Sequence, residues 1–219
     1  MLEKFVKKTS FSSHQDFIEN YEIQVPENFN FAYDVVDEWA HTHPEKKALC
    51  WTNDKGLHRD LTFGELKVLS DKTASFLQSL GIGKGDMVML ILKRSIEFWQ
   101  TILALHKIGA VAIPATHLLT DKDIIYRSNA ADVKAIVAAE DDNLITHVDL
   151  AMAKSPSVKH RILVGDTAPE GWVSFHQGVE NAVPFVKPEK VNTNEDIMIL
   201  YFTSGPTGQP KMVIHNFTY

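Results

Sequence analysis

Short apolar runs alternate with segments of helical periodicity along most of this chain. The run MVMLIL at residues 87–92 is apolar at every position, which is typical of a strand with both faces buried. Residues 63–80 before it and 95–108 after it repeat their apolar side chains with the spacing of an amphipathic helix. The alternation continues to about residue 165. It predicts a layered α/β sandwich with a largely parallel sheet.

Capping residues mark the ends of two predicted helices. Thr62 and Glu65 have the spacing of a capping box and Gly81 stands where a C-terminal cap belongs, so a helix is expected over residues 63–80. Ser95 and Gly109 bracket the next helix in the same way. Further strands are expected at residues 48–51, 59–62, 110–116, 134–139 and 160–165, and further helices near residues 14–23, 31–43 and 142–154 and from residue 120.

The composition changes near residue 181, where two prolines and a polar, acidic stretch precede the apolar run IMILYF. Such a stretch is typical of a long connection between structural units. We therefore expect an N-terminal extension at residues 1–27 and a first α/β subdomain at residues 28–187. Residues 188–219 would form a linker and the start of a second subdomain, with IMILYF beginning a new layer.

The charge balance excludes one large class of function. Lys and Arg number 22 against 28 Asp and Glu, a formal charge of −6, so the chain lacks the positive character of a nucleic-acid-binding protein. Its apolar runs are too short to span a bilayer, and its first residues contain no apolar core of secretory length. These features predict a cytoplasmic protein. The single cysteine, Cys50, lies in the apolar run ALCW and is expected to be buried.

Two glycine-rich loops are candidates for binding phosphate. The first, GIGKGD at residues 81–86, follows a predicted helix and precedes a strand. A dinucleotide-binding loop has the opposite order, and the C-terminal end of a helix repels anions. We therefore expect this loop to be a tight turn between a helix and a strand.

The second loop, TSGPTGQPK at residues 203–211, combines hydroxyl donors, two glycines and one lysine. Glycine lets backbone N–H groups approach a ligand closely, and a lysine ammonium is a compact positive charge, so the combination suits a polyphosphate. It is not a Walker loop, because Pro210 precedes Lys211 and Met212 follows it. An exposed polar hairpin turn is the alternative, since these residue types are also common in turns.

The segment YFTSGPTGQPKMVIH resembles the phosphate-binding signature of the adenylate-forming (AMP-binding) enzymes, usually TSGTTG, a variable residue, then Pro-Lys. This superfamily includes acyl-CoA synthetases, peptide adenylation domains and firefly luciferase. The upstream segments LTFGEL, GIGKGDMVML and FWQTILALHKIGAVAIPAT agree with the family in order and spacing. The segments FNFAYDVVDEWA, DIIYR and YFTSG are most similar to the short- and medium-chain, acetyl-CoA synthetase-like branch. The resemblance extends over nearly the whole chain from about residue 28.

The resemblance implies a two-step acid-thiol ligase reaction. A carboxylate attacks the α-phosphorus of ATP bound with Mg²⁺, giving acyl-AMP and pyrophosphate, and the thiol of coenzyme A then displaces AMP to form a thioester. By the same resemblance, the loop would hold the β- and γ-phosphates of ATP. Its residues are Thr203, Ser204, Gly205, Pro206, Thr207, Gly208 and Lys211.

Four residues of the loop or of segments that match the family have features of their own. Pro206 stands where the family usually has Thr or Ser, so a hydroxyl and a backbone N–H are both lost. His215 matches a family histidine near the acyl-binding region and is a weaker candidate for binding substrate. Tyr126, with Arg127 beside it, is a candidate for approaching coenzyme A.

Enzymes of this family are far longer, and their catalytic and magnesium-binding residues would follow Tyr219. We therefore expect the chain to be the N-terminal portion of an AMP-forming acyl-CoA synthetase that is inactive by itself, with neither catalytic residues nor metal ligands of its own. Two alternatives stay open: an adenylate-forming enzyme with another acceptor, and a fragment that only binds. The acyl-chain preference and the oligomeric state stay open as well.

Overall fold

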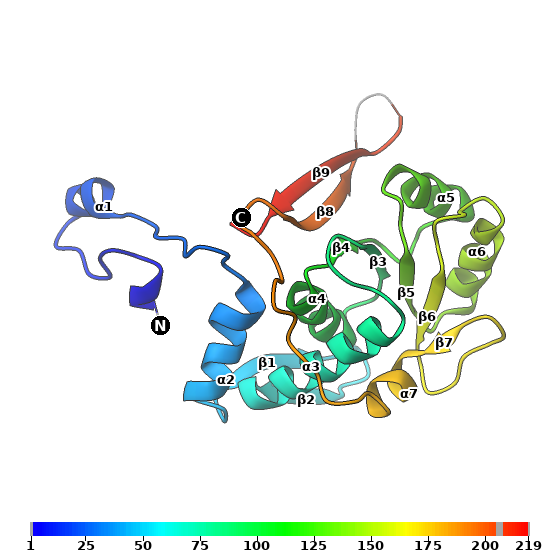
Figure 1. Cartoon of the computed structure of the whole chain (residues 1–219), viewed down its shortest axis with the longest axis horizontal. Helices are drawn as coiled ribbons and strands as arrows, with labels where there is room; N and C mark the ends of the chain where they lie inside the picture. The colour runs from blue at the N-terminus through cyan, green and yellow to red at the C-terminus, as the bar shows by residue number, and fades with distance from the viewer. Residues whose placement is uncertain (1, 205–207, 219) are drawn as a thin grey trace.

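A seven-stranded sheet in the order β7-β6-β5-β3-β4-β8-β9 forms the centre of the molecule. The computed structural model describes residues 2–204 and 208–218. Every strand pair in this sheet is parallel except β8 with β9, which is antiparallel. Its strands are β3 (Met87–Ile91), β4 (Val111–Pro114), β5 (Ala135–Ala139), β6 (His160–Val164), β7 (Val173–Ser174), β8 (Ile197–Thr203) and β9 (Lys211–Asn216). The predicted largely parallel sheet is therefore confirmed (Figure 1).

Helices cover both faces of the sheet and make three layers. They are α3 (Phe63–Ser79), α4 (Ile96–Ile108), α5 (Asp121–Ala130), α6 (Asp142–Met152) and α7 (Phe175–Glu180). Alternate residues of β3 point to opposite faces: Val88 and Leu90 pack in the apolar cluster with α3, α4 and α7, whereas Met89 and Ile91 pack in the cluster with α5 and α6. Strand β3 is thus buried on both faces, as its continuous apolar run predicts.

The helix ends agree with the capping residues of the sequence. Thr62 and Glu65 form both hydrogen bonds of a capping box at the start of α3, and Gly109 ends α4 in the left-handed conformation with a φ of 70°. Ser95 occupies the N-cap position of α4, but its hydroxyl makes no capping hydrogen bond. Gly81 and Gly85 have φ values of 74° and 80°, so the loop at residues 81–86 is the tight turn that we expect.

An antiparallel ribbon of β1 (Lys47–Thr52) and β2 (His58–Thr62) lies outside the central sheet. Its position corrects the prediction for Cys50, which is exposed and not buried. In the ribbon Cys50 lies opposite Asp60, and the two side chains are hydrogen-bonded. An apolar run of four residues does not show whether its strand will join a central sheet or a ribbon of two strands. Side chains of a two-stranded ribbon are less completely covered by neighbouring elements than those of a central sheet.

The N-terminal region contains η1 (Leu2–Lys4), α1 (His14–Asn20), η2 (Phe31–Asp37) and α2 (Glu38–Thr42). Figure 1 shows that η1 and α1 lie on an arm away from the sheet. The helix expected near residues 31–43 begins as a π-helix, η2, and continues as α2. Both ends of η2 have tertiary partners: the Asn30 side chain donates to the carbonyl of His106, and Asp37 bonds Lys107.

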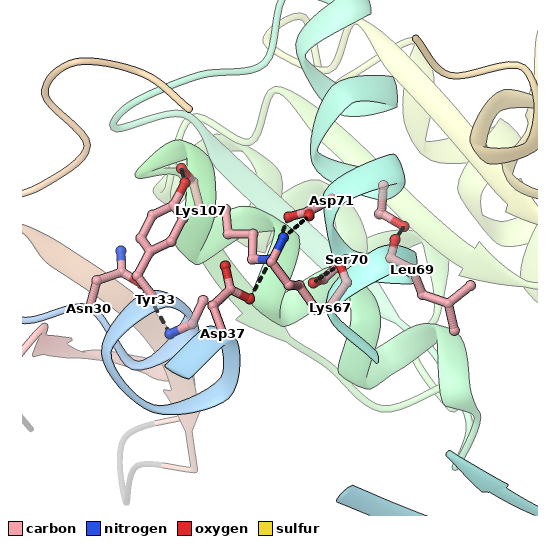
Figure 2. Close-up of polar contacts among 10 residues, drawn as sticks. Asn30, Tyr33, Asp37, Lys67, Leu69, Ser70, Asp71 and Lys107 are labelled. Carbon is pink, nitrogen blue, oxygen red and sulfur yellow. Dashed lines mark hydrogen bonds and ion pairs between the residues drawn. The ribbon is translucent and has the colours of Figure 1, made fainter. Parts of the chain in front are cut away.

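A buried ionic cluster joins η2 to α3 and α4 (Figure 2). The Lys107 side chain is fully buried, and its Nζ donates to Asp37 Oδ1 at 2.8 Å and to Asp71 Oδ1 at 2.5 Å. The hydroxyl of Tyr33 donates to the carbonyl of Lys107 at 2.9 Å. Burial raises the pKa of the Asp37 carboxyl, although Lys107 opposes this effect. The buried Lys107 ammonium is thus paired with carboxylates from two other helices, η2 and α3.

Strand β8 extends the same sheet that the earlier strands form. It pairs in parallel with β4, with Ala112 opposite Ile199, so residues 197–203 are continuous with the first sheet and do not begin a separate layer. The sequence places this strand after a long polar connection, and only pairing with β4 shows where it inserts. The division at residues 27 and 187 stays a prediction.

Candidate phosphate-binding hairpin

The predicted phosphate loop lies at the turn of the β8–β9 hairpin. Because β8 runs parallel to β4, its carboxyl end lies at the sheet edge where β3, β4 and β5 also end. Ligands of open α/β sheets bind outside this edge. Figure 1 shows β8 and β9 extending from the sheet, with the start of β9 on the side of α5. The fold therefore presents the loop at the edge expected for a ligand.

Thr203 and Lys211 face each other where the two strands end. Both residues are exposed, as is Ser204 after the first strand. Within the described part of the chain, no carboxylate forms an ion pair with the Lys211 ammonium. Its charge is thus available to an anionic ligand. Gly205, Pro206 and Thr207 lie outside the described residues, so their predicted contacts to phosphate stay predictions.

Gly208 is exposed and has a φ of 97°. This left-handed conformation strongly favours glycine. A Cβ atom built on Gly208 meets no atom of the described residues within 4 Å, so the backbone conformation is what favours glycine here. The open space lets a ligand approach the backbone at this position.

Helix α5 contacts the second leg of the hairpin. The hydroxyl of Tyr126 donates a hydrogen bond to the carbonyl of Pro210 at 2.8 Å. The Tyr126 and Phe202 ring centroids are 6.1 Å apart, and the Arg127 guanidinium lies 5.4 Å from the Phe202 ring centroid. From the sequence, Tyr126 and Arg127 are candidates for approaching coenzyme A, and their contact with the hairpin is not predicted. It joins residues 84 positions apart, so no local pattern reveals it.

His215 lies on β9, away from the turn. It is half-buried and opposite Ile199, and its ring centroid lies 5.8 Å from that of Tyr201. A role in binding the acid substrate stays a prediction.

Two other kinds of feature are absent from the described residues. No group of three or more His, Cys, Asp or Glu side chains has an arrangement suited to a metal ion there. Within the same residues, no helix has the length and apolar character needed to cross a membrane.

Curated relatives match most of the chain but only about a third of their own length. Acyl-coenzyme A synthetase ACSM5 of Rattus norvegicus is 42% identical over 198 residues, which are 88% of this chain and 34% of the relative. ACSM3 of the same species is 35% identical over 212 residues, covering 94% and 36%. ACSM1 of Homo sapiens is 39% identical over 199 residues, covering 88% and 34%.

These relatives correct one prediction made from composition. All three are named as mitochondrial proteins, which contradicts the expectation of a cytoplasmic protein. The expectation was wrong because it was drawn from apolar runs too short to span a bilayer and from a missing secretory core. Neither feature decides between compartments inside a cell.

Solved structures agree with the fold, and a family model matches most of the chain. The anthranilate CoA ligase AuaEII, in complex with anthranoyl-AMP, has a TM-score of 0.78 at 24% identity, covering 88% of this chain and 36% of that one. A fatty acyl CoA synthetase of Mycobacterium tuberculosis has a TM-score of 0.71 at 22% identity, covering 86% and 34%. Residues 36–219, all but the N-terminal arm and part of η2, match the AMP-binding enzyme family. The chain therefore belongs to the AMP-binding enzyme family.

Proposed function

We propose that this chain supplies the phosphate-binding hairpin of an AMP-forming acyl-CoA synthetase. The substrates would be a carboxylic acid, ATP and coenzyme A, and the products acyl-CoA, AMP and pyrophosphate. One observation carries the proposal: β8 ends at the carboxyl edge of the parallel sheet just before a glycine- and hydroxyl-rich loop, and the Lys211 ammonium after that loop forms no ion pair with a carboxylate of a described residue. The names of the curated relatives support the same activity.

The first step leaves negative charge on the oxygens of the departing pyrophosphate. Lys211 would neutralise part of this charge, and the hydroxyls of Thr203 and Ser204 would donate hydrogen bonds to it. Backbone N–H groups near Gly205 and Gly208 would complete the contacts, with Thr207 as a third hydroxyl. The reaction gains mainly from positioning and charge stabilisation, because the hairpin itself has no group that must exchange a proton.

Mg²⁺ would enter with ATP and supply further charge neutralisation on its phosphates. This ion prefers oxygen ligands, mainly carboxylates and waters. The described part of the hairpin offers hydroxyls and an ammonium but no carboxylate, so these residues do not fit a protein-bound magnesium site. The chain's own contribution is therefore binding of the phosphates.

Exchange of labelled pyrophosphate into ATP tests the proposal in the intact protein. Short- and medium-chain fatty acids, an aromatic acid and several amino acids are compared as the acid substrate. Exchange with the fatty or aromatic acids, followed by thioester formation with coenzyme A, is expected. Exchange with amino acids alone would favour an adenylation domain, and no exchange with any acid would reject an adenylate-forming enzyme.

Lys211→Met measures the contribution of the lysine. A hydrogen bond to a charged group contributes about 1.5–3 kcal/mol, so we expect exchange to fall roughly tenfold to a hundredfold. Lys122→Met is the matched control, because Lys122 is an exposed lysine on α5 and forms no hydrogen bond or ion pair with the described residues of the hairpin. Equal activity of the two variants would show that Lys211 does not bind the phosphates.

A further inference from the structure

The hydrogen bond between Tyr126 and Pro210 ties the hairpin to helix α5 at a particular peptide. Pro210 immediately precedes Lys211, the first residue of β9. The carbonyl that accepts from Tyr126 belongs to the peptide bond whose nitrogen is that of Lys211. Because a peptide unit is planar, fixing its oxygen also fixes the direction in which the chain enters Lys211.

Two further contacts hold the Tyr126 end of this bond. Tyr126 packs against Phe202 at an interplanar angle of 67°, and Phe202 is the residue before Thr203 on the other leg of the hairpin. Arg127 lies over the same ring at 5.4 Å from its centroid. Helix α5 therefore contacts both legs of the hairpin next to the residues proposed to bind phosphate.

The Arg127 side chain is itself held in place. Its Nη1 donates to the carbonyl of Asp123 at 3.2 Å and lies 3.4 Å from the Asp123 carboxylate. The Asp123 carboxylate also accepts from the backbone N–H and hydroxyl of Thr120, which lowers the pKa of Asp123. Only 12% of the Arg127 side chain is exposed, so its guanidinium interacts mainly with Asp123 of α5 and with the Phe202 ring and little with solvent.

We infer that Tyr126 is a positioning residue for ATP, acting through the Pro210 carbonyl to set the place of Lys211. The inference rests on the proposed function, because only that function assigns a phosphate of ATP to Lys211 as its ligand. The rest of α5 packs on the sheet through Ile124 and does not reach the hairpin by a described hydrogen bond.

Tyr126→Phe in the intact protein removes the hydroxyl and keeps the ring. One neutral hydrogen bond is worth a few-fold change in an equilibrium, so we expect the KM for ATP to rise about two- to tenfold. The KM for the acid is expected to stay unchanged, since the acid does not contact Lys211 in this scheme. Steady-state pyrophosphate exchange at varied ATP and varied acid measures both constants.

Tyr33→Phe is the matched control. Tyr33 also donates its hydroxyl to a backbone carbonyl, that of Lys107, at 2.9 Å, but this bond joins η2 to α4 and involves no residue of the hairpin. Both variants lose the same kind of bond. A general loss of stability would therefore affect the two alike, whereas positioning of Lys211 raises the KM for ATP in Tyr126→Phe only.

Hydrogen exchange without nucleotide separates this inference from the proposed function. Amide exchange across residues 208–213 is expected to speed up several-fold in Tyr126→Phe and to stay at the wild-type rate in Tyr33→Phe. If exchange and the KM for ATP both match the wild type, the inference is wrong. The wild-type protein could also show no pyrophosphate exchange while the hairpin amides exchange faster in Tyr126→Phe. The Tyr126–Pro210 hydrogen bond would then hold the hairpin in place, and the proposed function would be wrong.

Discussion

His106 shows how a single buried residue sets a pH dependence. It lies on α4 and lines an apolar groove of about 520 Å³ with Phe29, Trp39 and Phe217. Only 5% of the residue is exposed, and neither ring nitrogen has a hydrogen-bond partner among the described residues. Burial lowers the pKa of His106 to about 4, because the charged form would lose its hydration.

The sign of the stability change follows from this pKa. The unfolded chain takes up the proton near pH 6.5 and the folded chain near pH 4, so stability falls as the pH falls between these values. From pH 7 to pH 5 the loss due to His106 is about 2 kcal/mol. Urea unfolding of His106→Leu at both pH values should show a smaller acid loss than the wild type by this amount. His41→Leu, at an exposed position on α2, is the control.

Pro206 is the second residue for which we predict an effect. It replaces the usual Thr or Ser of the family, and it lies outside the described residues. Restoring the hydroxyl and the N–H offers ATP up to two more donors, so Pro206→Thr is expected to raise the rate of pyrophosphate exchange by about tenfold. Kinetics of the intact variant at saturating acid measure this rate. An unchanged or lower rate would show that proline does not limit ATP turnover.

At the scale of elements, the buried cluster of Figure 2 joins three helices that apolar contacts alone would leave less well fixed. Lys107 of α4 is its centre, with Asp37 from η2 and Asp71 from α3. Removing the lysine takes the ion-pair partner from the largely buried Asp37 carboxylate and leaves Asp71 with Lys67 alone. Breaking a buried pair in this way costs several kilocalories per mole, far more than losing a surface pair.

Lys107→Met is accordingly predicted to lower the free energy of unfolding by about 3–5 kcal/mol. Lys67→Met is the matched control: Lys67 also bonds Asp71, at 2.5 Å, but its side chain is 41% exposed. A change within about 1 kcal/mol is expected there. Urea unfolding of both variants at pH 7 measures the difference. A Lys107→Met protein as stable as the control would mean that the cluster does not hold the helices together.

At the scale of the molecule, strand order brings the functional segments to one edge of the sheet. The chain passes from β3 to β4 on one side, returns to β5 on the other, and later adds β8 beside β4. The carboxyl ends of these strands and the start of α5 therefore lie along one edge, and the β8–β9 turn is beside them. Tyr126 and Pro210, far apart in sequence, meet because of this order.

The sequence alone was enough for the features that depend on near neighbours. Continuous apolar runs predicted strands buried on both faces, Thr62 with Glu65 and Gly109 marked helix ends, and residues 203–211 carried the recognisable loop. Periodicity and capping act over a few residues, so they can be read before any fold is known.

Only the tertiary structure decided the features that depend on distant partners. It exposed Cys50 by placing its strand in a ribbon, buried Lys107 between two aspartates, and inserted β8 beside β4. It also joined Tyr126 to Pro210. Burial and long-range hydrogen bonds depend on which surfaces pack together when the layers assemble. The pattern of residue types along the sequence does not specify those contacts.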